Sequence, residues 1–585
     1  MKTKKNIIVF ILIFSMVLNL NANDTIKVEN LENINKSMSS LISIIKKISD
    51  WNDFDMYTFN TLINSDDAES WFELGNCYYY GNGTEQNYTQ AFECYKKSTE
   101  VEPMNGYAWY NLGVCYNNGY GTEQNYTQAF ECYKKATEVD PMYGKAWSNL
   151  GYYYVNGTGT EQNYTQAFEC YKKSTEVDPM NGYAWYNLGV CYYNGNGTEQ
   201  NYTQAFECYK KSTEVEPMNG YAWYNLGVYY HNGYGTEQNY TQAFECYKKS
   251  TEVDPMYGYA WYSLGYCYEN GNGTERNYTQ AFECYKKSTE VDPMNGYAWY
   301  NLGVCYNNGT GTEQNYTQAF ECYKKATEVN SMNGYAWYNL GVCYEKGYGT
   351  EMNYAKAVEC YKKFMENDGY LYKIFGITEN TLFFECCKKI IELDQTDVNA
   401  WINLGYCYKN GFSTEQNHTK AYECYNKAIE IDPMNADALN NLGDCYYFGK
   451  GTNINYSQAF ECYNKAIEMD SMNADTWNNL GNCYYLGRGT NFSYSQAFEC
   501  YNKAIEIDSN NTDAWNNLGN CYNFGKGTNV NYSQAFECFK KATGVDPMLQ
   551  DAWNLLGHCY NYGRGTKRDT AKANECYNKA KELGM

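Results

Sequence analysis

The chain has 585 residues, a formal net charge of −22 and a pI near 4.7. This acidic balance argues against nucleic-acid binding, because proteins contact the phosphate backbone mainly through Lys and Arg. It also disfavours docking on anionic lipid. An aromatic content of 18% excludes a largely disordered chain.

The first residues have the order of a secretory signal peptide. Lysines at 2–5 precede an apolar run at 7–20, and small residues follow it near Ala22. The run is shorter than the roughly 20 residues that span a bilayer, so an uncleaved anchor is the less favoured alternative. We expect residues 1–22 to be removed after Ala22, and the mature protein to be secreted or periplasmic. Residues 23–67 precede the repeats, and their amphipathic stretch at 37–51 predicts an N-terminal capping segment.

From residue 68 the chain is repetitive, and tryptophan marks the period. Successive tryptophans stand 38 residues apart in two series, which are interrupted between Trp337 and Trp401. The marked positions are Trp71, Trp109, Trp147, Trp185, Trp223, Trp261, Trp299, Trp337, Trp401, Leu439, Trp477, Trp515 and Trp553. With one damaged copy in the gap, the spacing predicts about fourteen repeats.

Each repeat predicts two helices. In "AWYNLGVCYNNGYG", Trp109, Leu112, Gly113 and Tyr116 fall on one helical face, and the glycines then break the helix. Asn125 followed by Gln128 predicts a cap that opens the second helix. All eight prolines fall where that helix ends, as a residue that breaks helix interiors should.

These motifs resemble a known repeat family. The "W..LG..Y" at 109–116, the "A...Y..A" at 129–136 and the "DP" at 140–141 resemble the tetratricopeptide repeat, and the longer middle turn resembles that of Sel1-like repeats. The resemblance covers about residues 68–585. It implies an all-α fold, a right-handed α-solenoid (superhelix) of stacked antiparallel helix pairs, in which each 38-residue repeat contacts only its neighbours.

The repeats fall into two blocks whose recurring amino-acid sequences differ. Block one, at 68–366, has eight repeats, and block two, at 398–585, has five, the last more polar as a capping repeat should be. Between them lies a degenerate repeat at 367–397, in which Tyr372 stands in for tryptophan and the middle loop is missing. We expect it to change the local curvature, and the less favoured alternative is that it is only the scar of a deletion.

The 26 cysteines recur mainly as one per helix, as Cys115 and Cys132 do. If Gly113 faces Ala129, these two thiols are separated by more than a disulfide can span, about 7 Å between Cα atoms. We therefore favour buried packing thiols. Bridges between repeats remain the alternative, and metal binding is disfavoured because no CxxC pair is present.

Catalysis finds little support. His231, His418 and His558 lie in different repeats without a recurring Ser or Asp partner, so we expect no enzyme activity, no catalytic residue, no metal and no cofactor. Sequons such as those at Asn82 and Asn125 are read mainly as turn and capping residues, with glycosylation as the alternative.

In tetratricopeptide proteins the first helices line a concave groove, and the resemblance implies that the groove here is lined by the residues two before, and one, two and five after, each tryptophan. Asparagine can pair with a peptide unit, and tyrosine adds rigid contact area. Some family members hold the terminal carboxylate of a peptide with a clamp of Lys and Arg. Here the corresponding positions are mainly Tyr, Asn and Val, which disfavours binding of a peptide through its terminal carboxylate. The candidate groove residues are Asn111, Asn149, Asn187, Asn225, Asn301, Asn339, Asn403, Asn441, Asn479, Asn517, Tyr110, Tyr186, Tyr224, Tyr262, Tyr300 and Tyr338.

The sequence therefore favours an exported, non-enzymatic scaffold that binds protein or extended peptide partners along a Tyr- and Asn-lined groove. Two other functions stay open. One is a structural spacer at the cell envelope or surface, whose groove is idle, and the other is a binder of cell-wall glycan.

Overall fold

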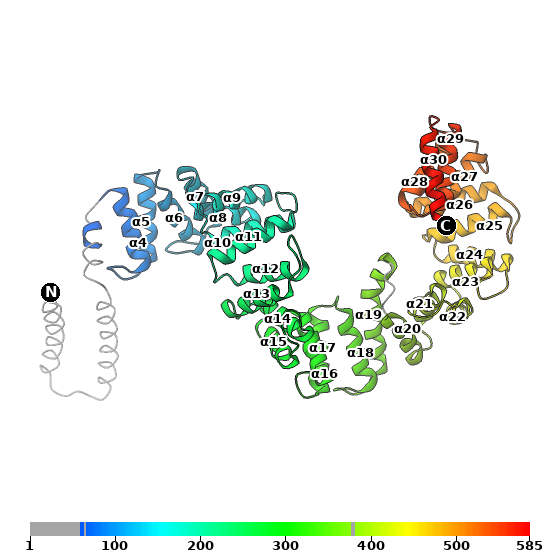
Figure 1. Ribbon diagram of the computed structural model, residues 1–585, viewed down its shortest axis with the longest axis horizontal. Coiled ribbons are helices and arrows are strands. Elements are labelled where there is room, and N and C mark those ends of the chain that lie inside the picture. Colours follow the sequence, from blue (N-terminus) through cyan, green and yellow to red (C-terminus); the bar gives the residue numbers. More distant parts are fainter. Residues whose placement is uncertain (1–58, 64–65, 376–380, 585) are drawn as a thin grey trace. The chain divides into compact units, whose positions relative to one another are not determined.

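The computed structural model describes residues 59–63, 66–375 and 381–584 (Figure 1). The predicted signal peptide and most of the predicted capping segment lie outside the described residues. The chain divides into two compact parts, Met1–Asn277 and Tyr278–Met585, which are described separately below as the N-terminal and C-terminal parts.

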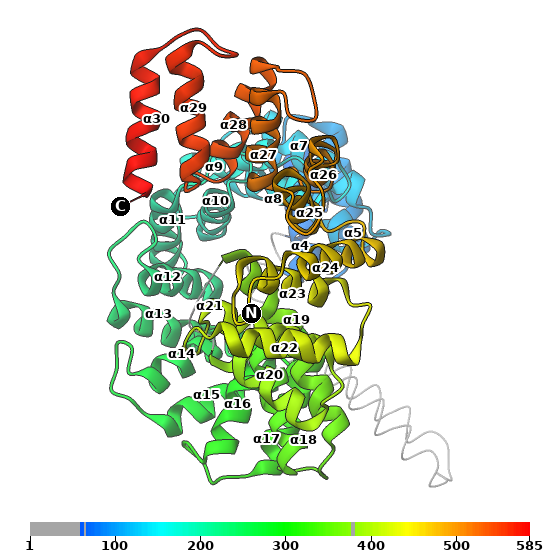
Figure 2. The same ribbon diagram turned by 90° about the vertical axis from the view of Figure 1, so that its right-hand side faces the viewer.

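Every regular element of the described residues is a helix, and consecutive helices pack as antiparallel pairs (Figures 1 and 2). The N-terminal part holds α4 (Ala68–Tyr80), α5 (Tyr88–Val101), α6 (Gly106–Asn118), α7 (Tyr126–Val139), α8 (Gly144–Asn156), α9 (Tyr164–Val177), α10 (Gly182–Asn194), α11 (Tyr202–Val215), α12 (Gly220–Asn232), α13 (Tyr240–Val253) and α14 (Gly258–Asn270).

The C-terminal part continues the series. It holds α15 (Tyr278–Val291), α16 (Gly296–Asn308), α17 (Tyr316–Val329), α18 (Gly334–Lys346), α19 (Tyr354–Phe375), α20 (Thr381–Leu393), α21 (Val398–Asn410), α22 (His418–Ile431), α23 (Ala436–Phe448), α24 (Tyr456–Met469), α25 (Ala474–Leu486), α26 (Tyr494–Ile507), α27 (Thr512–Phe524), α28 (Tyr532–Val545), α29 (Gln550–Tyr562) and α30 (Thr570–Leu583). The prediction of an all-α fold of stacked antiparallel pairs, with about fourteen repeats, is confirmed.

Local signals set the helix ends. Asn125 is the N-cap of α7, where its side chain accepts a hydrogen bond from the backbone N–H of Gln128 at 3.0 Å, as the sequence predicted. The first helix of the same repeat, α6, ends at Gly119, whose φ of 70° is left-handed and whose N–H bonds to the Cys115 carbonyl. Glycine suits this position because it has no Cβ to oppose a positive φ.

The hydrophobic core is shared between neighbouring repeats. Ala91, Phe92 and Tyr95 of α5 pack in one buried cluster with Leu112 and Cys115 of the next repeat's first helix. The core therefore runs from repeat to repeat, which is why one helix pair could not bury its apolar face alone.

Inside a repeat, Gly113 of the first helix lies against the second helix. A Cβ on Gly113 would lie 2.8 Å from the Tyr133 ring and 3.2 Å from the Cβ of Cys132, so Gly113 faces these residues. The large Tyr133 ring fills the space that the glycine leaves. Cys115 and Cys132 belong to one buried cluster and form no disulfide with each other.

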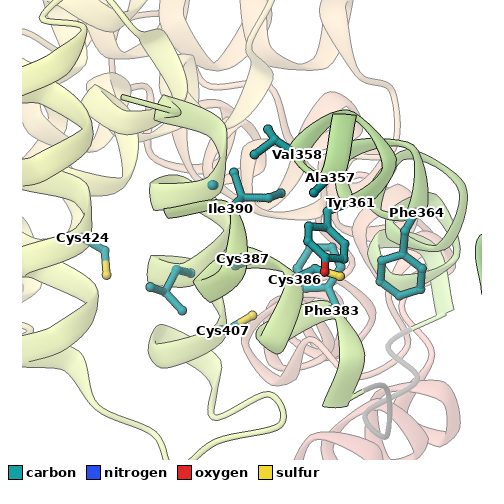
Figure 3. Close-up of a cluster of buried hydrophobic side chains, with 12 residues drawn as sticks. Ala357, Val358, Tyr361, Phe364, Phe383, Cys386, Cys387, Ile390, Cys407 and Cys424 are labelled. Carbon is teal, nitrogen blue, oxygen red and sulfur yellow. The ribbon is translucent and has the colours of Figure 1, made fainter. Parts of the chain in front are cut away.

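The degenerate repeat is joined to the repeat before it. Helix α19 spans 22 residues, where the other second helices span 14 or fewer, and it includes the position of Tyr372, whose side chain is outside the description. No proline or glycine-rich turn interrupts the stretch between Cys360 and Asp368, so the helix runs on. Buried residues of α19 and α20, among them Tyr361, Phe364 and Cys387, form a cluster with Cys407 of α21 (Figure 3).

In the described part of the chain, none of the helices is both long and apolar enough to cross a membrane.

Candidate binding surface

The predicted groove residues form hydrogen-bonded pairs between repeats. Asn149 on α8 lies with its Nδ2 3.5 Å from the hydroxyl of Tyr110 on α6. Burial raises the pKa of Tyr186, and a hydrogen bond with Asn225 partly offsets that rise. The tyrosine of one repeat thus meets the asparagine of the next repeat, which makes a ladder along the first helices.

Other asparagines of the predicted set also bond within the protein. Asn111 donates to the side-chain oxygen of Asn76 at 3.2 Å, and Asn479 donates to Asp444 at 3.1 Å. Asn187 donates instead to the Tyr183 carbonyl of its own helix at 2.9 Å. Part of the hydrogen-bonding capacity that the sequence assigned to a ligand is therefore used between and within repeats.

All the predicted groove residues are half-buried, including Asn301, Asn339 and Asn403. The tyrosines among them pack on other rings: Tyr224 lies 5.0 Å from Tyr257 and 5.8 Å from Tyr247 between centroids. They are half-buried and held by aromatic neighbours, so they form a rigid floor.

A more exposed row lies one turn earlier on the same helices, two residues before each tryptophan. The resemblance to tetratricopeptide repeats implies that this position lines the groove, but its residues are not among the named candidates. In the repeats of α6 to α18 most are tyrosines exposed by 40–53%: Tyr107, Tyr183, Tyr221, Tyr259, Tyr297 and Tyr335.

In the last four first helices of the C-terminal part, the same position is acidic. Asp437, Asp475, Asp513 and Asp551 are all exposed. The surrounding protein desolvates Asp513 and raises its pKa, and the neighbouring charges of Asp475 and Asp546 add to that rise. This row therefore carries mutually repelling carboxylates, whereas the tyrosine row is uncharged.

A small cavity interrupts the ladder in the N-terminal part. It has a volume of about 200 Å³ and is lined by His231, Tyr247, Tyr262, Ser263 and Tyr266. Ser263 stands where most repeats have asparagine, and the shorter side chain leaves room. Burial lowers the pKa of His231, so its ring is neutral near pH 7.

The remaining candidate groups stay apart. His418 begins α22, and His558 on α29 lies with its Nδ1 3.3 Å from the Tyr577 hydroxyl. Within the ranges described here, no group of three or more His, Cys, Asp or Glu side chains is arranged to hold a metal ion.

No disulfide is formed within the described residues, and all the cysteines except the half-buried Cys462 are buried. Burial raises the pKa of Cys132 to about 12, with the charges of Glu131 and Cys115 adding to the rise. Such thiols are protonated at neutral pH, so they act as small apolar packing groups.

Stacked helix pairs with a polar and aromatic first-helix surface define a helical repeat scaffold. The chain belongs to the Sel1 repeat family. The Sel1 repeat model matches residues 68–100, 107–139, 146–177, 183–214, 221–253, 258–291, 297–331, 335–367, 436–471, 513–543 and 551–585. Models of the TPR repeat match 415–447 and 493–523, and a tetratricopeptide repeat model matches 386–420. Scaffolds of this kind typically serve protein–protein interaction and are generally non-catalytic.

Several solved structures are similar to this chain. The protective antigen c5321 of uropathogenic Escherichia coli strains, which displays an SLR fold, is 26% identical, with 90% of this chain and 97% of that chain covered and a TM-score of 0.46. A Sel1 repeat protein from Oxalobacter formigenes is 26% identical, with coverages of 44% and 96% and a TM-score of 0.38. No curated protein matches the chain closely enough to count as a relative.

Proposed function

We propose that this chain is an exported, non-enzymatic scaffold that binds an extended polypeptide along the first helices of its repeats. The observation that carries the proposal is the exposed tyrosine row beside the half-buried Tyr–Asn ladder, for example Tyr221 next to Tyr186 and Asn225. Exposed tyrosines supply large contact area at low cost in side-chain entropy. The Asn amides and Tyr hydroxyls of the ladder can also form hydrogen bonds with a peptide backbone.

The acidic row supports a chemical preference. A polypeptide segment with Lys or Arg side chains would relieve the repulsion among Asp475, Asp513 and Asp551 in the C-terminal part. The net charge of −22 would also speed the encounter with a cationic segment at low salt. The tyrosine row has no such bias and suits segments of mixed composition.

The binding test compares two triple variants of the full chain on an array of short unstructured peptides and cell-wall glycan fragments. Replacing Tyr183, Tyr221 and Tyr259 by Ala removes exposed rings. At about 1 kcal/mol or more for each contact residue, binding should weaken by roughly a hundredfold. The matched control replaces Lys172, Lys210 and Lys248 by Ala, which are exposed on the second helices.

The expected result is peptide binding that the tyrosine variant loses and the lysine variant keeps, with unchanged circular dichroism for both. Equal binding by the two variants would remove the tyrosine row from the mechanism. Binding to glycan alone would support the glycan function, and binding to nothing would leave the spacer as the better explanation.

Export is tested separately. A chain without residues 1–22 should remain in the cytoplasm of the producing cell, since the predicted signal is what directs it out. Recovery of the chain outside the cell with Met1 intact would contradict cleavage.

A further inference from the structure

The turns that join one repeat to the next carry a row of exposed methionines. Ten of these turns place methionine at the same position, and the side chains are exposed by 62–73%. Single exposed apolar side chains are common on protein surfaces, so what distinguishes these is their recurrence at one position in repeat after repeat. The row consists of Met104, Met142, Met180, Met218, Met256, Met294, Met332, Met434, Met472 and Met548.

The backbone of these turns is held without help from the methionine side chain. The N–H of Met142 donates to the carboxylate of Asp140 at 3.0 Å, and the carbonyl of Pro141 accepts from the Trp147 indole at 3.0 Å. Both polar groups of the peptide unit between Pro141 and Met142 are therefore occupied. A chemical change at the sulfur would leave this arrangement intact.

The same two bonds recur along the chain. The N–H of Met256 donates to Asp254 at 3.2 Å and Trp261 donates to the Pro255 carbonyl at 3.0 Å. Near the C-terminus, the N–H of Met548 donates to Asp546 at 2.8 Å. In each of these turns the local geometry depends on the backbone, the Asp side chain and the tryptophan.

The thiols of the protein have the opposite character. All except Cys462 are buried, and burial raises the pKa of Cys132 and Cys170 to about 12. An oxidant attacks the thiolate, and susceptibility follows thiolate character and exposure. A thioether needs no deprotonation, so an oxidant arriving from solvent meets the methionine row before it meets a reactive cysteine.

We propose that the methionine row is a set of sites for reversible oxidation by a two-electron oxidant of the peroxide class. A sulfur lone pair attacks one oxygen of hydrogen peroxide, the O–O bond breaks, and the sulfur keeps that oxygen as a sulfoxide while one water is released. The return step consumes two thiols of a methionine sulfoxide reductase system, which become a disulfide, and the oxygen leaves as water.

The consequence is a change of surface without a change of fold. A sulfoxide is polar where the thioether was apolar, so oxidation converts the turns of the repeats from apolar to polar. The core clusters, which contain no member of the row, stay closed. The inference does not depend on the proposed polypeptide partner.

The test treats the folded full chain with dilute hydrogen peroxide and follows each methionine by peptide mass mapping. Each of the ten members should gain one oxygen atom early. Met365 is the internal reference, because it is half-buried against the cluster of the degenerate repeat and should react later. Labelling of the unfolded product should show all 26 thiols still free, and circular dichroism should be unchanged.

Three results would overturn the inference. These are loss of thiols before the methionines gain oxygen, oxidation of Met365 at the rate of the row, or loss of helix when the row is oxidised.

Reversibility is tested on the oxidised protein. Incubation with reductases of both stereospecificities and a thiol should restore the original masses, and failure to do so would refute reversibility. A variant with Met142, Met180, Met218 and Met256 changed to Leu should fold normally and take up four fewer oxygen atoms.

Discussion

The indole Nε1 of Trp223 donates a hydrogen bond to the carbonyl oxygen of Pro217, 2.9 Å away. The same bond closes the turn before Trp109, Trp185 and Trp553, in each case to the carbonyl six residues earlier. The tryptophan that marks each repeat therefore fastens the turn through which one repeat leads into the next. A leucine can replace its packing, as the buried Leu439 does, but cannot donate this bond.

We expect Trp223→Phe to lower the free energy of unfolding by about 1 kcal/mol for the lost hydrogen bond, in addition to any loss of packing. Amide hydrogen exchange should quicken first in residues 216–223, because the opening is local to the turn. The matched control is Leu439→Phe, at a position where the bond is absent. A uniform loss of protection across the chain would contradict a local role.

Gly113→Ala tests the helix register. The new Cβ would lie 2.8 Å from the buried Tyr133 ring, so we expect a destabilisation of about 1–3 kcal/mol from overpacking. Gly544→Ala is the control, because a Cβ there meets nothing within 4 Å, and the gain in helix propensity should stabilise α28 by about 0.5–1 kcal/mol. Denaturant unfolding of the two variants should move in opposite directions.

Glu345 links three helices around the degenerate repeat, because its carboxylate accepts from Tyr361 of α19 and pairs with Lys389 of α20. Burial raises its pKa, but the hydrogen bonds from Lys346, Lys389 and Tyr361 outweigh this and lower it from 4.5 to about 2.

Since the folded-state pKa is below the unfolded one, the stability that Glu345 contributes is present above about pH 4.5 and is lost as the pH falls toward about 2. Glu345→Gln should therefore melt below the parent at pH 6 and approach it at pH 2. Parallel melting curves for the two proteins across this range would contradict the assignment.

The cysteines should be unreactive until the protein unfolds. At pH 7 a thiolate-specific reagent should label the folded chain slowly, with the half-buried Cys462 reacting ahead of the buried thiols. After unfolding without reductant, all 26 should react. A large fraction that reacts only after reduction would show disulfides and would reopen the bridged alternative.

The local elements of this protein follow from its sequence, since their causes are near in the chain. Asn125 and Gln128 mark the start of α7 because a side-chain oxygen reaches an N–H three residues on. Gly119 and Pro141 mark helix ends through their backbone geometry alone. The tryptophan period then determined the number of repeats, and with it the all-α class of stacked pairs.

Contacts between helices needed the tertiary structure. The periodicity placed Gly113 on the buried face, but only the size of the Tyr133 ring decided which residue it opposes. Likewise, the pattern placed Tyr110 and Asn149 on one surface, but their pairing across repeats depends on how far one helix is shifted along the next. That shift is set by side-chain volumes packing in three dimensions, which a one-dimensional period does not contain.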